Sequence, residues 1–241
     1  MKHSSHFGAA GYYANMAAKA GLIGLAVSNV DPNMAVPGSR GMVIGNNPLA
    51  YAVPSSTTPT IFLDIAMSNV ASLKVIQARR DGVSIPDTWI VDGDGLATTD
   101  PSKYPEEGAM QPFARHKGYG IAMLVDVLSG GLSGGGMSML GGIVSWLFQL
   151  DKKNNVSHTF IAIDPACFAG KEQFDADMDA MAAALRSAPK AKNSERIYTP
   201  GEIEWEHYAD AEQNGIPLPQ DLYESLHALA AELNIELGTE A

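Results

Sequence analysis

The chain has 241 residues, of which 46% are hydrophobic, 18% are charged and 24 are glycine. This composition excludes a disordered chain, a coiled coil and a collagen-like fibre, and the length suits one large domain or two small ones. The net charge of −11 argues against a nucleic-acid partner.

The negative charge is concentrated in the last third of the chain. Residues 172–241 carry 15 acidic and 4 basic side chains, whereas residues 1–171 carry 12 of each. We therefore expect an exposed acidic helical surface at the C-terminal end. The neutral part remains suitable for an anionic ligand.

The single cysteine, Cys167, excludes an intramolecular disulfide. Its apolar neighbours Ala166 and Phe168 favour a buried structural thiol over a reactive one. No apolar run approaches the roughly 18 residues that a membrane span needs, and residues 1–6 contain no apolar signal-peptide core. We expect a cytoplasmic protein without a membrane partner.

Helical and strand patterns alternate along the first two thirds of the chain. Residues Ala9–Ala20 predict a helix that ends at Gly21, and Leu22–Ser28 predicts a buried strand. The remaining elements expected here are strands at Leu49–Val53, Thr60–Asp64 and Thr159–Ile163, a helix at Ile65–Arg79, and a buried helix at Tyr119–Leu128.

The last third indicates helices alone. Thr199-Pro200-Gly201-Glu202 has the pattern of a capping box, with Thr199 as the N-cap and Glu202 reaching back to it. Apolar stripes with 4-3-4 spacing predict the two flanking helices: Phe174, Met178, Met181, Leu185, and Leu222, Leu226, Leu229, Leu233. The fold class is therefore α/β with a helical C-terminal layer.

His6 is the best candidate for a general acid or base, because an unperturbed imidazole titrates near neutral pH. It stands in Ser4-Ser5-His6-Phe7-Gly8, directly before a predicted helix, and Gly8 would let a substrate approach closely. A capping or surface histidine remains the alternative. A metal site that uses His3 and His6 has no third ligand at a recognisable spacing.

A second candidate lies at the start of the predicted buried helix. Arg115-His116-Lys117-Gly118 places two fixed cations where the helix dipole and free N–H groups favour an anion. Lys117 would add a point charge for a phosphate or carboxylate. A solvated basic cluster is the alternative.

Other motifs give weaker signals. The glycine-rich residues 130–136 follow the predicted helix and therefore predict a loop instead of a phosphate cradle. The sequence has no Rossmann fingerprint and no P-loop. Glu204-Trp205-Glu206-His207 predicts an exposed acidic helix face, since a di-metal site needs a second copy of the motif.

Taken together, these segments resemble the malate/L-lactate dehydrogenase family that lacks the Rossmann fold. The matching stretches run in family order over the whole chain, and the pair IPDTW…TTDP and KGYG most resembles the ureidoglycolate dehydrogenase branch. They lie at residues 4–29, 45–54, 62–68, 84–101, 116–134, 160–165 and 198–206.

The resemblance implies a homodimeric oxidoreductase that uses NAD or NADP and acts on a 2-hydroxy or 2-keto acid. It implies a non-Rossmann NAD(P)-binding α/β domain at residues 1–170 and a helical segment at 171–241 packing on it. His6 matches the histidine of the family's His-x-Gly segment, which is the proton acceptor in the ureidoglycolate dehydrogenase branch. The positions that match cofactor contacts are Asp64, Ile65, Ala66, Lys117, Gly201, Glu202 and Ile203.

The chain also departs from the family pattern. Val30 replaces a cofactor-contacting serine, Asn46 a threonine, and Asn154 an arginine suited to a substrate carboxylate, while Arg115 and His116 replace small or aromatic residues. Nothing before residue 4 matches the family's long N-terminal substrate-binding segment, and we expect Met1 to lie within a strand. The alternatives are therefore a non-catalytic nucleotide-binding remnant or a subunit completed by a partner chain. An apolar face left uncovered would promote association.

Overall fold

The computed structural model describes residues 1–56, 59–145 and 149–237. In the described part of the chain, no helix is long and apolar enough to cross a membrane. The elements are α1 (Ala10–Lys19), β1 (Ile23–Ser28), β2 (Leu49–Val53), β3 (Ile61–Ile65), α2 (Ser72–Asp81), β4 (Ile90–Val91), β5 (Ala97–Thr98), η1 (Pro101–Lys103), β6 (Ala109–Met110), α3 (His116–Asp126), η2 (Val127–Gly131), β7 (His158–Ile163), η3 (Pro165–Cys167), α4 (Lys171–Ser187), α5 (Glu202–Asn214) and α6 (Gln220–Leu233).

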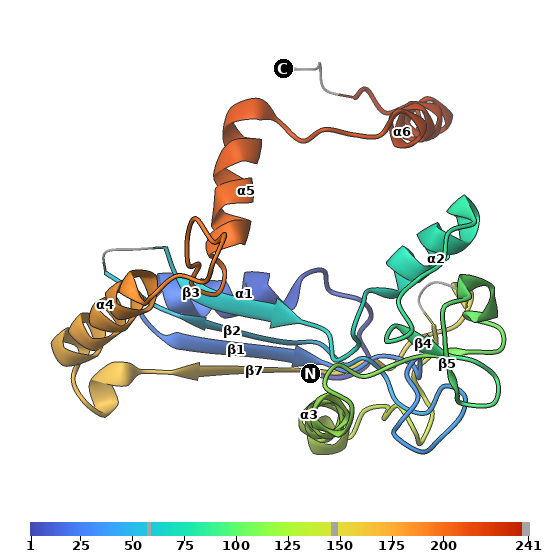
Figure 1. The fold of residues 1–241 in the computed structure, drawn as a ribbon, viewed down its shortest axis with the longest axis horizontal. Helices are drawn as coiled ribbons and strands as arrows, with labels where there is room; N and C mark the ends of the chain where they lie inside the picture. The colour runs from blue at the N-terminus through green and yellow to red at the C-terminus, as the bar shows by residue number, and fades with distance from the viewer. Residues whose placement is uncertain (57–58, 146–148, 238–241) are drawn as a thin grey trace.

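A four-stranded sheet forms the centre of the molecule, with the strand order β3-β2-β1-β7 (Figure 1). Every neighbouring pair is antiparallel, and Leu25 of β1 is paired with Tyr51 on one side and Ile161 on the other. A Rossmann sheet is mostly parallel. The antiparallel sheet therefore agrees with the non-Rossmann fold that the resemblance implies.

Helix α1 covers one face of this sheet through very small side chains. Ala10, Ala14 and Ala18 of the helix pack on Ala26 of β1 and on alanines of β2. A Cβ atom on Gly24 would lie 2.2 Å from the backbone oxygen of Ala14, so only glycine allows this close approach. The backbone of α1 therefore packs directly against the backbone of β1.

A second, smaller body lies beyond one end of the large sheet and contains α2 and the three-stranded sheet β5-β4-β6 (Figure 1). Its core is built from fully buried side chains that come from well-separated parts of the chain. They include Met34, Met67, Val75, Ile90 and Met110. This core fixes the loop that follows β3 against the loop that precedes α3.

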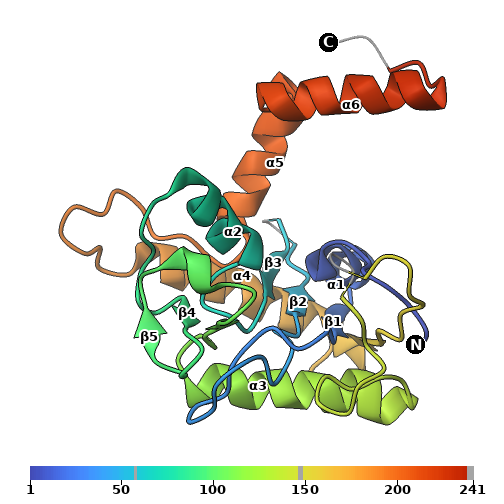
Figure 2. The same ribbon diagram turned by 90° about the vertical axis from the view of Figure 1, so that its right-hand side faces the viewer.

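The C-terminal helices differ in how closely they contact the sheets. The start of α5 is held on β3, because Trp205 Nε1 donates a 2.8 Å hydrogen bond to the backbone oxygen of Thr60 and its ring lies 5.4 Å from the ring of Phe62. Helix α6 lies away from both sheets in both views (Figures 1 and 2). Its leucine stripe is exposed, with Leu229 and Leu233 half exposed.

Most predicted elements agree with the structure to within one or two residues, but the helix predicted at Ile65–Arg79 begins too early. Ile65 closes β3, and the helix starts only at Ser72. The segment Ala66–Val70 belongs instead to an irregular connection, whose Met67 and Val70 are buried in the second core. The apolar content of a segment does not by itself distinguish a buried connection from the buried face of a helix.

Two burial predictions are also wrong, and a loop prediction and a strand prediction hold only in part or not at all. Cys167 is exposed at the end of η3. Met123 and Leu124 of α3 are 51% and 53% exposed, so this helix is buried on one side only. Of the residues 130–136 predicted as a loop, Gly130 and Gly131 belong to the π-helical turn η2 that continues α3, whereas Gly134, Gly135 and Gly136 lie in a turn and loop as predicted. Met1 lies outside any strand, although Ser4 forms a bridge to Val156.

Candidate functional site

One cleft of about 280 Å³ lies where the two bodies meet, beside the start of α1 and the end of β3. Three of the predicted site residues line it, namely His6, Asp64 and Ala66. The other residues that line it are Phe7, Gly8, Ala9, Ala10, Ser28, Val30, Asp31, Asn33, Asn46, Pro48, Ser72, Tyr104, Ser145 and Val156.

His6 is positioned through its neighbour Phe7. The Phe7 ring stacks between Tyr13, at 4.8 Å, and the buried ring of His158, at 4.2 Å. The Tyr13 hydroxyl also donates a 3.0 Å hydrogen bond to the backbone oxygen of Phe7. The backbone N–H of Gly8 donates to Nδ1 of His6 at 3.2 Å. In a neutral ring whose Nδ1 accepts this bond, the proton resides on Nε2.

His158 supports the opposite side of the same aromatic stack. Its ring is 1% exposed, and its Nδ1 lies 2.8 Å from the hydroxyl of Ser28, which lines the cleft. Burial lowers the pKa of His158, because the apolar surroundings disfavour the imidazolium form. His158 is therefore a neutral support for the segment that carries His6.

Asp64 stands at the end of β3, where the strand meets the first turn of α1. The backbone N–H of Gly11 donates a 2.7 Å hydrogen bond to Oδ2 of Asp64. Partial burial raises the pKa of the Asp64 carboxyl, the Gly11 bond lowers it, and the negative charge of Glu204 raises it. Of the two following residues, Ala66 lines the cleft, whereas Ile65 packs against the second core.

Lys117 does not line the cleft but lies exposed in the first turn of α3. The loop before α3 is tied to the residue after Ala66, because Phe113 N–H donates a 2.9 Å hydrogen bond to the backbone oxygen of Met67. Gly118 packs so closely on Phe113 that a Cβ atom would lie 2.3 Å from the Phe113 oxygen. These contacts bring the start of α3 to the end of β3.

The predicted contacts at Gly201–Ile203 form the start of α5, which also lies against β3. Gly201 has φ +87°, and a Cβ atom there would lie 2.4 Å from the Phe62 ring. The helix begins at Glu202, two residues later than the capping pattern predicts, but Glu202 Oε2 accepts the expected hydrogen bond from Thr199 N–H at 2.8 Å. Contacts with Thr199 and arginines lower the Glu202 pKa to about 2.

The three predicted cofactor segments thus converge on β3 and on the residues that directly follow it, although only the first segment lines the cleft. Phe62 contacts the start of α5, Asp64 contacts the start of α1, and Met67 contacts the loop before α3. Glu204 of α5 is near enough to Asp64 for its charge to influence the Asp64 pKa. Long-range packing around β3 therefore assembles segments that are more than 130 residues apart in the sequence.

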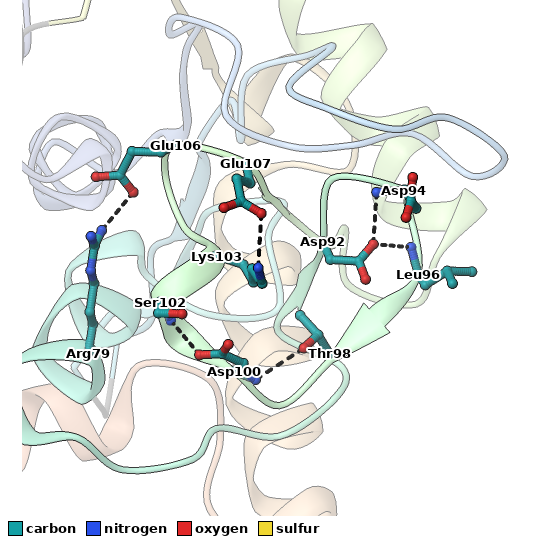
Figure 3. Close-up of polar contacts among 10 residues, drawn as sticks. All are labelled: Arg79, Asp92, Asp94, Leu96, Thr98, Asp100, Ser102, Lys103, Glu106 and Glu107. Carbon is teal, nitrogen blue, oxygen red and sulfur yellow. Dashed lines mark hydrogen bonds and ion pairs between the residues drawn. The ribbon is translucent and has the colours of Figure 1, made fainter.

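Two functional candidates were missed from the sequence. Asp31 lines the cleft one residue after Val30, a family contact position, and this proximity was the only available signal. Tyr104 is 4% exposed and reaches the cleft from the loop after η1. Its neighbourhood is held by Arg79, which donates a 2.9 Å hydrogen bond to the backbone oxygen of Tyr104. Arg79 also pairs with the carboxylate of Glu106 at 2.7 Å (Figure 3).

The residues that depart from the family pattern have clear positions. Val30 lines the cleft, and its N–H donates a 3.0 Å hydrogen bond to the buried side chain of Asn47. Asn46 also lines it and pairs with Asn33 through bonds of 2.8 and 3.0 Å. Asn154 is not a cleft residue and instead bonds the backbone of Val144.

The family profile for malate/L-lactate dehydrogenase matches residues 1–227. The chain belongs to this family. It is 35% identical over 242 residues to a malate dehydrogenase of Pyrococcus horikoshii, covering 98% of this chain and 66% of that protein. It is also 35% identical over 222 residues to the ureidoglycolate dehydrogenase (NAD(+)) of Escherichia coli O157:H7, covering 92% and 62%.

Comparison with solved structures also places the chain in this family. The sulfolactate dehydrogenase from Methanocaldococcus jannaschii has a TM-score of 0.87 and 32% sequence identity, over 97% of this chain and 66% of that one. The family and the α/β fold expected from the sequence are therefore confirmed. The chain spans 62% to 66% of the length of these relatives.

The residues present fit a nicotinamide dinucleotide in their donor and acceptor chemistry. Asp64 offers a carboxylate of the kind that binds ribose hydroxyls, and Lys117 offers a cation at a helix N-terminus for a phosphate. The first turn of α5 differs, because Glu202 and Glu204 make it acidic. The backbone and the carboxylates of this turn can bind ribose hydroxyls. Their negative charge disfavours a phosphate there.

Proposed function

We propose that this chain forms the cofactor-binding and proton-transferring part of an oxidoreductase that uses NAD or NADP and a 2-hydroxy or 2-keto acid. The observation that carries the proposal is that His6, Asp64 and Ala66 contribute to the same cleft. When bound, the nicotinamide ring supplies or accepts the hydride. Residues 1–170 would form the cofactor-binding part, and residues 171–241 the helical part.

The role of His6 is to move the hydroxyl proton. Its Nδ1 is the basic nitrogen in the tautomer that the Gly8 bond favours. That bond, at 3.2 Å, lies at the long end of the hydrogen-bond range. A substrate hydroxyl that replaces the Gly8 N–H at Nδ1 gives its proton to the ring when the alcohol is oxidised. Reduction uses the same proton in the opposite direction.

The roles of Asp64, Ile65, Ala66, Lys117, Gly201, Glu202 and Ile203 as cofactor contacts are part of this proposal. Lys117 would neutralise phosphate charge at the start of α3. Asp64 would accept hydrogen bonds from ribose while Gly11 orients its other oxygen. Ile65 would act through the backbone, because its side chain packs into the core.

The experiment compares the wild-type chain with His6→Asn and the matched exposed control His207→Asn. Reduced-nicotinamide absorbance is followed with malate, lactate, ureidoglycolate and sulfolactate, and cofactor affinity is measured by calorimetry. We expect His6→Asn to lower turnover about 10²-fold or more, the usual range for a lost acid–base group, with cofactor affinity within about threefold. Equal turnover in His6→Asn and wild type would contradict the role of His6.

One observation favours a second candidate function. Among the described residues that line the cleft, none is lysine or arginine, and two are aspartate. A substrate carboxylate would then require a cation from outside this set, supplied by another chain or segment. The candidate is a nucleotide-binding module, for which calorimetry would show cofactor binding without turnover on any of the four acids.

We also propose that the chain works as a homodimer, as the family resemblance implies. The exposed leucine stripe of α6 and the exposed Met123 and Leu124 of α3 provide apolar surface for self-association. Light scattering tests this directly, and a monodisperse monomer would contradict it. The cytoplasmic location expected from the sequence stays a prediction.

A further inference from the structure

Asp31 is an acidic group inside the cleft for which the proposed reaction has no assigned use. It is half-buried, its carboxylate accepts a hydrogen bond from the Ser145 side chain, and it lines the cleft together with His6. Burial raises the pKa of the Asp31 carboxyl, although hydrogen bonds from its own backbone N–H and from Ser145 act to lower it. The carboxylate is therefore incompletely solvated and gains from a further hydrogen-bond donor.

A buried tyrosine lies beside Asp31. The buried Tyr104 lies close enough for the charge of Asp31 to help raise its pKa, to about 12, and its hydroxyl is bonded to Ser72. The loop that carries Tyr104 is secured at the η1 turn by Asp100, which bonds Ser102 N–H at 2.9 Å, and by the 3.0 Å Lys103–Glu107 ion pair (Figure 3). Tyr104 stays uncharged at neutral pH and cannot compensate Asp31.

The charge of the cleft restricts what can bind beside Asp31. The described lining residues include Asp31 and Asp64 but no lysine or arginine, and His6 is the one side chain among them that can become positive. A carboxylate placed beside Asp31 would meet a like charge in a partly desolvated site. An uncharged N–H donor would instead satisfy the carboxylate.

We propose that Asp31 recognises the carboxamide of the nicotinamide ring by accepting a hydrogen bond from its N–H, and so rejects a ring that carries a carboxylate. This rests on the proposed function, which puts the reactive end of the cofactor beside His6. A ring whose reactive carbon lies beside His6 has its carboxamide on the adjacent ring atom, within the same cleft of about 280 Å³. Asp31 is thus a specificity-determining residue.

The test uses two ligands that differ only at this group. Nicotinic acid adenine dinucleotide carries a carboxylate where NAD carries the carboxamide. Calorimetric affinities of both are measured for the full chain, for Asp31→Asn, and for the control Asp94→Asn. Asp94 has the same charge but lies exposed in the β4–β5 turn. Circular dichroism verifies that each variant is folded.

We expect the wild type and Asp94→Asn to bind NAD at least about tenfold more tightly than the carboxylate analogue, the effect of about 1.4 kcal/mol of repulsion. In Asp31→Asn this ratio should fall below about threefold. If the wild type binds both ligands equally, or if Asp31→Asn keeps the full ratio, the assignment of Asp31 is overturned while cofactor binding stands. If neither ligand binds the wild type, the proposed function and this inference both fail.

Discussion

The backbone N–H of Gly11 donates a 2.7 Å hydrogen bond to Oδ2 of Asp64, which joins the first turn of α1 to the end of β3. Asp64 also lines the cleft that contains His6. The N-terminal N–H groups of a helix have no partner within the helix and carry partial positive charge. Asp64 therefore stabilises the fold as well as serving the proposed cofactor site.

Replacing Asp64 tests its contribution to stability. We expect Asp64→Ala to lower the free energy of unfolding by about 1 kcal/mol, the usual cost of losing a helix-capping acceptor. Asp64→Asn retains a side-chain oxygen and should lose less. Urea unfolding measures both changes, and an Asp64→Ala variant as stable as wild type would show that the Gly11 bond contributes nothing.

Two glycines of α3 provide a matched pair. A Cβ atom on Gly118 would lie 2.3 Å from the backbone oxygen of Phe113, whereas Gly120 has open space around it. Gly118→Ala should therefore destabilise the protein by about 1–3 kcal/mol through overpacking. Gly120→Ala should instead stabilise it by up to about 1 kcal/mol, because alanine favours a helix. Thermal unfolding of both variants distinguishes the two effects, and equal shifts would contradict this prediction.

The buried pair Asn29 and Asp126 links β1 to α3. Asn29 Nδ2 donates to Asp126 Oδ1 and to the Gly136 oxygen, both at 2.8 Å, and Asp126 Oδ2 accepts from Ser138 N–H at 3.0 Å. Asp126→Ala leaves buried donors without their acceptor and should cost about 2–3 kcal/mol.

A double-mutant cycle with Asn29→Ala measures how much of that cost belongs to the pair. Because both side chains belong to one hydrogen-bond network, we expect a coupling energy above about 0.5 kcal/mol. Asp94→Ala, at an exposed turn position, should change the stability little. Additive effects of Asn29→Ala and Asp126→Ala would contradict the network.

The lowered pKa of His158 predicts acid sensitivity. Because burial moves it below its ordinary value of 6.5, the native state binds fewer protons than the unfolded state in the range below that value. The contribution of His158 to stability is then present above about pH 6.5 and decreases as the pH falls. The free energy of unfolding at pH 7 minus that at pH 5.5 should be smaller in His158→Gln than in wild type.

His207→Gln is the control for this measurement, because His207 is exposed on α5. It should keep the wild-type pH dependence. If His158→Gln loses as much stability as wild type between pH 7 and pH 5.5, His158 does not titrate as proposed. NMR of the imidazole protons provides an independent measurement of the His158 pKa.

Local patterns in the sequence determined most of the secondary structure and the family. The strand Leu49–Val53 was predicted with its observed bounds, and Gly21 ends α1 with a φ of +82° as expected. The Glu202–Thr199 bond of the capping pattern is also present. These features depend on residues at most four positions apart, so their physical causes are visible in a short stretch of sequence.

The tertiary structure decided which residues share the cleft and which faces are covered. Asp31 and Tyr104 are separated by more than 70 residues, yet they line the same cavity, and Cys167 is exposed despite its apolar neighbours. Burial depends on which distant segments pack on a residue, and no local period encodes that choice. The sequence by itself therefore identified His6 and Asp64 as candidates, whereas only the packing around β3 brought them together and placed Asp31 beside them.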